Sequence, residues 1–143
     1  MPKFRFLSGI DKTGAAFEAF GKTERELLQN SALALEEAMV DVRTLRRRES
    51  APLNIRETSL SSLLFKLLEH LIFLKSAKQL LFRDIKLGFE KQGKSYALQG
   101  FAYGERLDES KHKLRVNVKG ISLDLFEVKK AGNTFRAQVI LEV

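Results

Sequence analysis

The sequence predicts an α+β fold in which two helices pack on antiparallel sheet. Two segments carry apolar residues at helical spacing, whereas most of the remaining chain alternates apolar and polar residues as strands do. In chain order, the expected elements are two strands, a helix, a strand, a second helix and five further strands. The 143 residues fit one domain, residues 1–143, around a single core.

The first part of the chain predicts two short strands and an amphipathic helix. The stretch KFRFL alternates apolar and basic residues, and residues 14–21 are a second strand candidate. Thr23 and Glu26 have the capping-box spacing at the start of a helix over residues 23–40. Glu36 falls among the polar positions of this helix. Its apolar positions recur at helical intervals: Leu27, Leu28, Leu35, Ala38 and Met39.

A basic connector over residues 41–52 leads to a strand candidate at 53–58 and then to the most apolar segment, residues 59–82. This segment predicts a core helix with Ser59 as its N-cap. Apolar residues on nearly all of its sides imply that it packs between other elements. His70 has no second histidine or acidic pair at a ligand spacing, so it is interpreted as a packed or rim histidine, with a metal ligand as the alternative.

From residue 80 the pattern changes to a period of two residues. Residues 92–94 predict the turn of a hairpin, and residues 113–143 predict three more strands, with the last turn at Gly132 and Asn133. One of these strands is expected to place three apolar residues on a single face: Leu114, Val116 and Val118.

Composition narrows the classes of function. The formal charge of +7 favours polyanionic partners such as RNA, or an acidic face of a protein. Arg46, Arg47 and Arg48 could contact phosphates, or they could form a solvated face. The absence of cysteine excludes disulfides, thiolate zinc sites and thiol catalysis. No apolar run approaches the roughly 20 residues that span a bilayer and no secretory signal is seen, so we expect a cytoplasmic protein without membrane contact.

Common catalytic motifs are missing from the sequence. It contains no nucleotide-binding phosphate loop, no dinucleotide fingerprint, no zinc-protease motif and no nucleophile elbow. A self-sufficient enzyme is therefore disfavoured. Carboxylates could still bind a hard divalent cation without histidine or cysteine.

Five stretches in the expected order resemble the archease family over nearly the whole chain. They are FEAFGKTERELLQNSALALEEAMVD (17–41), LLFKLLEHLIFLKSAKQLLF (63–82), YGERLDESKH, VKGISL and the terminal VILEV. Seven residues of the third and fourth stretches have the spacing of that family: Gly104, Glu105, Leu107, Asp108, His112, Val118 and Lys119.

The resemblance implies a duplicated strand-helix-strand-strand fold and a role as accessory protein of an RtcB-type RNA ligase. Such a protein promotes metal-dependent guanylylation of the ligase from GTP, and multiple turnover, in tRNA splicing and RNA repair. The ligase would then use the GTP and perform the phosphoryl transfer, which explains the missing phosphate loop. Two alternatives are a metal-free, chaperone-like binding scaffold and a basic RNA-binding module.

The sequence departs from the family at the usual metal ligands. Asp11, Lys12, Thr13 and Gly14 stand where the family carries His-Thr-Ala-Asp, Ser76 replaces another acidic residue, and Leu123 and Asp124 replace Tyr-His. Glu142 keeps the penultimate acidic position. Either Asp11, Glu142 and the Val143 chain-end carboxylate form a rebuilt site for Mg²⁺, Mn²⁺ or Ca²⁺, or the scaffold has lost its metal.

Two further groups of residues leave alternatives open. Lys119 is expected on the polar side of its strand, where it could meet a GTP phosphate or an acidic ligase residue, or be an ordinary surface lysine. Glu105, Asp108 and His112 could shape a loop through capping and turn bonding, or contact a partner.

Overall fold

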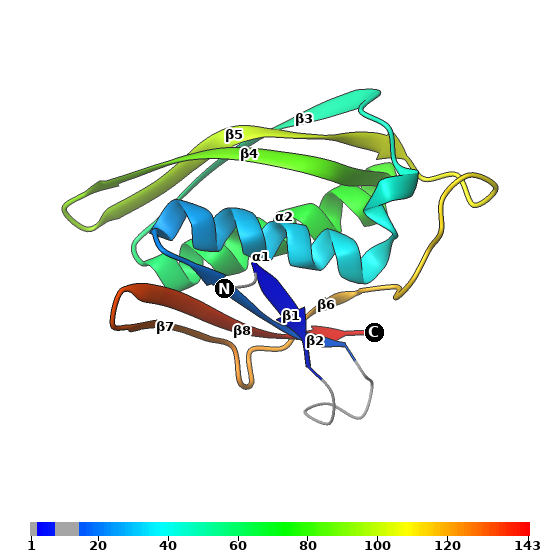
Figure 1. Ribbon diagram of the computed structural model, residues 1–143. Helices are drawn as coiled ribbons and strands as arrows, with labels where there is room; N and C mark the ends of the chain where they lie inside the picture. The colour runs from blue at the N-terminus through cyan, green and yellow to red at the C-terminus, as the bar shows by residue number, and fades with distance from the viewer. Residues whose placement is uncertain (1–2, 8–14) are drawn as a thin grey trace.

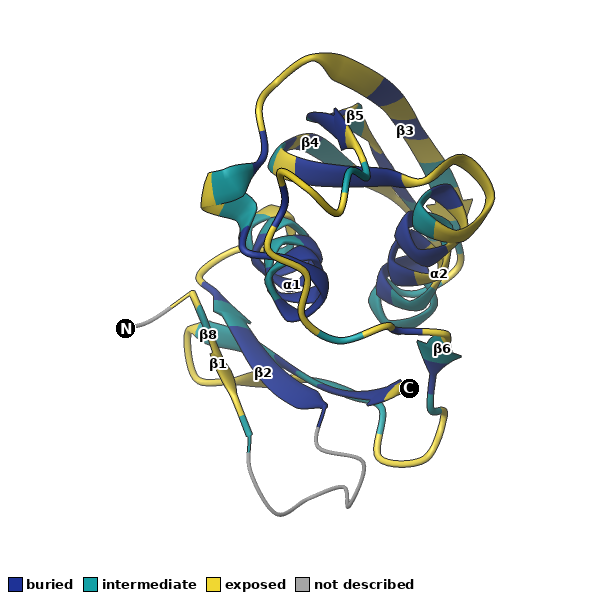
Figure 2. Ribbon diagram, turned by 90° about the vertical axis from the view of Figure 1, so that its right-hand side faces the viewer, coloured by how far each residue is buried: buried dark blue, intermediate teal, exposed yellow. Residues whose placement is uncertain are grey.

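The computed structural model describes residues 3–7 and 15–143. Two helices, α1 (Glu24–Met39) and α2 (Leu60–Lys78), lie side by side with an antiparallel sheet on each side of the pair (Figures 1 and 2). The predicted α+β class with helices on antiparallel sheet is therefore confirmed. The sheet is divided into two, so that the helices form the middle of three layers.

The strands form a three-stranded sheet and a five-stranded sheet. One sheet has the order β3-β5-β4, and the other has the order β1-β2-β8-β6 with β7 also paired to β8. All of these pairs are antiparallel. The strands are β1 (Phe4–Phe6), β2 (Ala16–Gly21), β3 (Glu49–Glu57), β4 (Leu80–Gln92), β5 (Ser95–Arg106), β6 (Gly120–Ile121), β7 (Glu127–Ala131) and β8 (Thr134–Glu142).

Local hydrogen bonds place the helix starts as predicted. Thr23 Oγ1 accepts from the Glu26 amide at 3.1 Å, and Ser59 Oγ accepts from the Ser62 amide at 3.1 Å. The reciprocal bond of the first cap goes to the preceding residue, because Glu26 Oε1 accepts from the Lys22 amide at 3.4 Å. The second helix ends at Lys78, where Gln79 takes a left-handed conformation (φ 56°), so the end of the apolar segment 59–82 belongs to β4.

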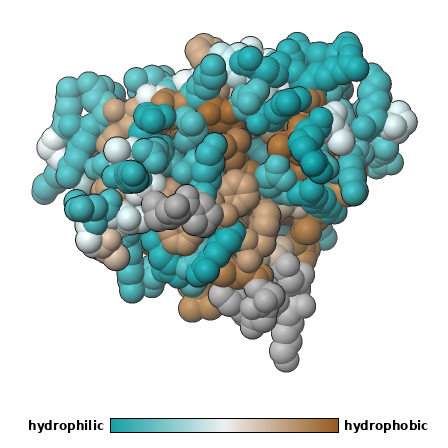
Figure 3. Space-filling model, in the orientation of Figure 1, coloured by the Kyte–Doolittle hydropathy of each residue, from teal (hydrophilic) through white to brown (hydrophobic). Residues whose placement is uncertain are grey.

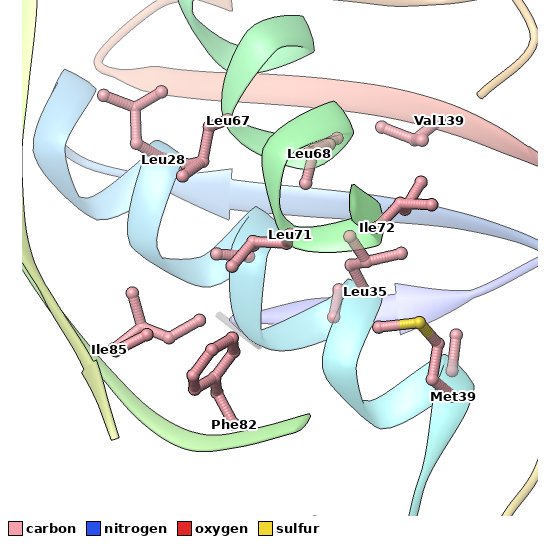
Figure 4. Packing of buried hydrophobic residues seen from close by; sticks show 14 of the residues in the cluster. Leu28, Leu35, Met39, Leu67, Leu68, Leu71, Ile72, Phe82, Ile85 and Val139 are labelled. Atoms are coloured by element: carbon pink, nitrogen blue, oxygen red, sulfur yellow. The ribbon is translucent and has the colours of Figure 1, made fainter. Parts of the chain in front are cut away.

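The core lies between the two sheets and takes in one broad face of α2, while its opposite face, with Phe73, is exposed. Figure 4 shows side chains from both helices and both sheets packed together, namely Leu28, Leu35, Met39, Leu67, Leu68, Leu71, Ile72, Phe82, Ile85 and Val139. The prediction that the second helix packs between other elements is thus confirmed. On the face drawn in Figure 3, apolar atoms gather in the middle, between the sheets, with hydrophilic atoms around them.

Residues 114–118 do not form the predicted strand. Leu114 makes an isolated antiparallel bridge with Val40, and the amides of Arg115 and Val116 donate to Met39 O and Ala38 O at the end of α1, at 2.9 and 3.0 Å. Alternation of apolar and polar residues favours a strand, but it does not show whether the backbone amides bond to a neighbouring strand or to the end of a helix.

The strand predicted at 53–58 begins earlier, at Glu49. Pro52 lies inside it and has no amide to donate. The sheet tolerates this proline because β3 is an edge strand, paired among the described strands with β5 alone.

Glu36 is buried, although its position in the sequence places it with the polar residues of the first helix. Its Oε1 accepts from the Phe82 amide at 2.9 Å, next to the register shift between Phe82 and Asp84 in β4. Its Oε2 has no hydrogen-bond partner among the described residues. Burial raises the pKa of Glu36 to about 8, although the Phe82 amide and the charge of Lys75 oppose that rise.

Candidate functional site

The last strand brings Glu142 beside Lys119. Gly120 of β6 pairs with Glu142 of β8, and the Lys119 amide donates to Glu142 O at 2.7 Å. A Cβ on Gly120 would lie 2.8 Å from Glu142 Oε1, so the glycine leaves room for the carboxylate over the strand backbone. Both Lys119 and Glu142 are exposed. A cation that directly precedes β6 and an anion on β8 therefore share one accessible edge of the five-stranded sheet.

The metal site predicted from Asp11, Glu142 and Val143 is only partly covered by the structure. Asp11 lies outside the described residues. Within residues 3–7 and 15–143, no group of three or more His, Cys, Asp or Glu residues could hold a metal ion. The structure describes two of the three predicted ligands, Glu142 and Val143, so the three-residue site stays a prediction.

The YGERLDESKH stretch is held together by a buried hydrogen-bond network. Glu105 Oε1 lies 2.9 Å from His112 Nε2 and accepts from the Arg46 amide at 2.9 Å. The Asp108 amide donates to His112 Nδ1 at 3.0 Å, so Nε2 carries the proton and donates to Glu105. The His112 hydrogen bond, the Arg46 amide and the charge of Arg48 hold the pKa of Glu105 below its usual value. These contacts are those of loop-shaping residues.

Gly104 of the same stretch allows two strands to approach closely. A Cβ built on Gly104 would lie 1.9 Å from the carbonyl oxygen of Leu81 on β4. Any larger residue would push β4 and β5 apart, so the glycine is required by backbone packing.

The three arginines predicted as phosphate contacts lie in different surroundings. Arg47 Nε is 3.1 Å from Asp84 Oδ2, and its guanidinium lies 4.4 Å from the centroid of the Tyr103 ring. Arg48 Nε is 3.5 Å from Glu105 Oε2. The Arg46 side chain is exposed and lines a cavity of about 370 Å³ that Arg48 and Glu105 also line. Phosphate contact at these residues stays a prediction.

His70 is a partly buried rim residue, as the first of the two interpretations expects. Its ring stacks on Phe73, with centroids 6.2 Å apart and planes at 17°. Burial, and then the charge of Lys78, lower the pKa of His70.

An aromatic pair that no motif in the sequence predicted lies on the outer face of β5. Phe101 is 49% exposed, and its ring centroid lies 6.3 Å from that of Tyr103. The available signal was the period of two residues, since the small residues Gly100, Ala102 and Gly104 alternate with the two rings.

A known protein family matches nearly the whole chain. The model of the archease protein family matches residues 10–143. The chain belongs to the archease family.

Similar members come from archaea. Protein archease of Pyrococcus furiosus is 32% identical over 111 residues, 78% of either chain, and that of Methanothermobacter thermautotrophicus is 30% identical over 129 residues, 90% of this chain and 91% of the relative. The solution structure of Methanobacterium thermoautotrophicum protein 1598 superposes with a TM-score of 0.85 at 30% identity, covering all of both chains.

A more distant structure shares the fold. The crystal structure of an archease, possible chaperone, from Thermotoga maritima has a TM-score of 0.62 at 18% identity and covers 97% of this chain and 98% of its own. None of the described helices is long and apolar enough to cross a membrane.

Proposed function

We propose that the protein is an accessory protein of an RtcB-type RNA ligase, and that it promotes ligase guanylylation from GTP and multiple turnover in RNA splicing or repair. Membership of the archease family supports a role exerted on a partner protein. The name possible chaperone, given to the Thermotoga maritima relative, is consistent with such a role. In this proposal the phosphoryl-transfer chemistry belongs to the ligase.

The observation that carries the proposal is the exposed pair of Lys119 and Glu142. Glu142 lies on β8, and the backbone bond to it, together with the Gly120↔Glu142 pairing, holds the backbone of Lys119 beside it, one residue before β6. The ammonium of an exposed lysine can bind a GTP phosphate or an acidic residue of the ligase. The adjacent carboxylate can accept hydrogen bonds from a basic residue of the same partner.

A multiple-turnover RNA ligation assay with the ligase from the same source tests the proposal. Wild type should increase both the number of turnovers and the rate of ligase guanylylation. Lys119→Ala should lose most of this stimulation, whereas Lys94→Ala, at an exposed hairpin turn, should keep it. Guanylylation rates that are identical with and without the wild-type protein, across GTP and metal concentrations, contradict the proposal. Binding to the ligase without stimulation would instead support the chaperone-like scaffold.

The rebuilt metal site is tested separately, by calorimetry with Mn²⁺ and Ca²⁺. If the site exists, Asp11→Asn and Glu142→Gln should each weaken binding, because each removes one charged ligand from the cation. Equal affinities of wild type and both variants, or no binding to wild type at millimolar metal, would leave a metal-free accessory protein.

A further inference from the structure

We propose that the outer face of the three-stranded sheet binds single-stranded RNA by stacking a base on Phe101. This inference goes beyond ligase activation and does not depend on it, since the binding would occur without any ligase. It rests on an exposed aromatic ring in the central strand of the sheet and on the cations that surround that ring.

Phe101 lies in the middle of the outer face. It belongs to the central strand β5, with Pro52 of β3 opposite on one side and Lys86 of β4 opposite on the other. Its neighbour Ala102 is buried against the helices, so Phe101 points away from them. Figures 1 and 2 show no described helix or strand over this face. The ring is therefore accessible to a planar ligand.

Tyr103 lies next to Phe101 on the outer face of the three-stranded sheet, and Arg47 packs on the Tyr103 ring. Arg47 covers the Tyr103 ring and pairs with Asp84, so the face of Tyr103 is already occupied while that of Phe101 remains open. The ion pair also offsets the charge of Asp84, one of the carboxylates on the outer face. A nucleotide stacked on Phe101 would thus have an arginine, rather than an unpaired carboxylate, beside it.

Two further basic residues, Lys86 and Arg83, lie on β4 near the aromatic pair. The exposed Lys86 stands directly opposite Phe101, within the short cross-strand spacing of about 5 Å between Cβ atoms. Beyond Tyr103, Arg83 donates to Leu45 O at 3.1 Å, which holds its guanidinium beside the connector that carries Arg46. Phosphates on either side of a stacked base would meet these positive charges, in agreement with the net charge of +7.

This combination selects a single-stranded polynucleotide as the ligand. An exposed ring on a sheet face stacks on unpaired bases, whose flat faces a duplex hides, and nearby cations bind the phosphates between them. Removing one aromatic stacking partner should weaken binding about 5- to 150-fold, the factor that corresponds to roughly 1–3 kcal/mol per stacked base.

Fluorescence anisotropy with a labelled uridine 12-mer at low salt tests the proposal on the full chain without ligase. Wild type should bind the oligonucleotide, and should bind a duplex of the same length more weakly. Phe101→Ala should weaken binding by the factor given above, and Phe101→Tyr should restore it. Lys86→Ala should reduce the steepness of the log–log salt dependence by about 0.7, the value for one phosphate contact on a single strand.

Phe73→Ala is the matched control, because Phe73 is 54% exposed but lies on α2 in the middle layer. It should bind as wild type does, and circular dichroism should show that both alanine variants remain folded.

No binding of the wild type at 100 µM protein, equal binding by wild type and Phe101→Ala, or an equal loss in Phe73→Ala would overturn the proposal. Full binding by Phe101→Leu would show an apolar contact rather than stacking, and would also overturn it. So would a Phe101→Ala variant that keeps RNA affinity but loses ligase affinity, since the face would then bind protein.

Discussion

The buried carboxyl of Glu36 should make the stability of the protein depend on pH. In the folded state its pKa is raised from 4.5 to about 8, first because burial disfavours the charged form. A folded pKa above the unfolded value means that the unfolded chain loses this proton first as the pH rises. The stabilisation is therefore complete below pH 4.5 and is lost progressively until the pH reaches the folded pKa near 8.

The shift sets the size of the effect. Each unit of pKa difference corresponds to about 1.4 kcal/mol, so the full loss between pH 4.5 and 8 is on the order of 5 kcal/mol. Between pH 5.5 and 7.5 the wild type should lose about 3 kcal/mol of its free energy of unfolding through this group alone. Glu36→Gln cannot ionise, yet its amide oxygen can still accept from the Phe82 amide at the position that Oε1 occupies.

Urea unfolding followed by circular dichroism at pH 5.5, 6.5 and 7.5 measures this difference. The two histidines are present in both proteins, so subtracting one free energy from the other gives the contribution of Glu36, including its electrostatic coupling to Lys75. Glu37→Gln is the control, because Glu37 is the next residue of the helix but pairs with Arg115 at the surface, and it should keep the wild-type pH dependence. Parallel pH profiles for wild type and Glu36→Gln would refute the reasoning.

Three further substitutions test individual contacts by their effect on unfolding. Gly104→Ala should destabilise by about 2 kcal/mol or more in urea, because its Cβ would lie 1.9 Å from Leu81 O; a loss below about 0.5 kcal/mol would mean that the strands separate easily. Thr23→Ala should cost about 1 kcal/mol, since it removes the N-cap of α1, and unchanged urea midpoints would show that the cap is dispensable. His112→Ala should lower the thermal midpoint by about 3 °C or more, because it leaves a void beside Glu105, and an unchanged midpoint would argue against a loop-shaping role.

The helices could be predicted because their signals are local. Thr23 and Ser59 cap the two helices with hydrogen bonds to residues three positions ahead, and the apolar spacing within each helix follows from the helical period. Apolar residues on nearly all sides of the second helix also predicted that it packs between other elements. The turns at Gly93 and Gly132, both with positive φ, were equally visible in the sequence.

The features that were missed depend on tertiary contacts. The segment around Arg115 alternates like a strand, but its amides donate to the end of α1, a partner 76 positions earlier in the chain (115 − 39). Glu36 occupies a polar position by helical period, yet α1 lies between two sheets and has little free surface. Phe101 follows the two-residue period of a strand, and that period does not say which of the two faces is buried. Only the packing of β5 on the helices shows that Phe101 faces outward.

The central place of β8 in the five-stranded sheet has a consequence for how the chain folds during synthesis. All partners of β5 have been made once Arg106 leaves the ribosome, so the three-stranded sheet can assemble with α2 early. By contrast, β2 must wait for a partner 122 positions later, as in the Phe17↔Val139 pair (139 − 17). Until then Phe17 and Ala19, both buried in the finished fold, lack their β8 partners, although β1 is already present. Nascent chains should therefore be most prone to association in the interval before β8 emerges, and loop closure of this length should make its docking a slow step.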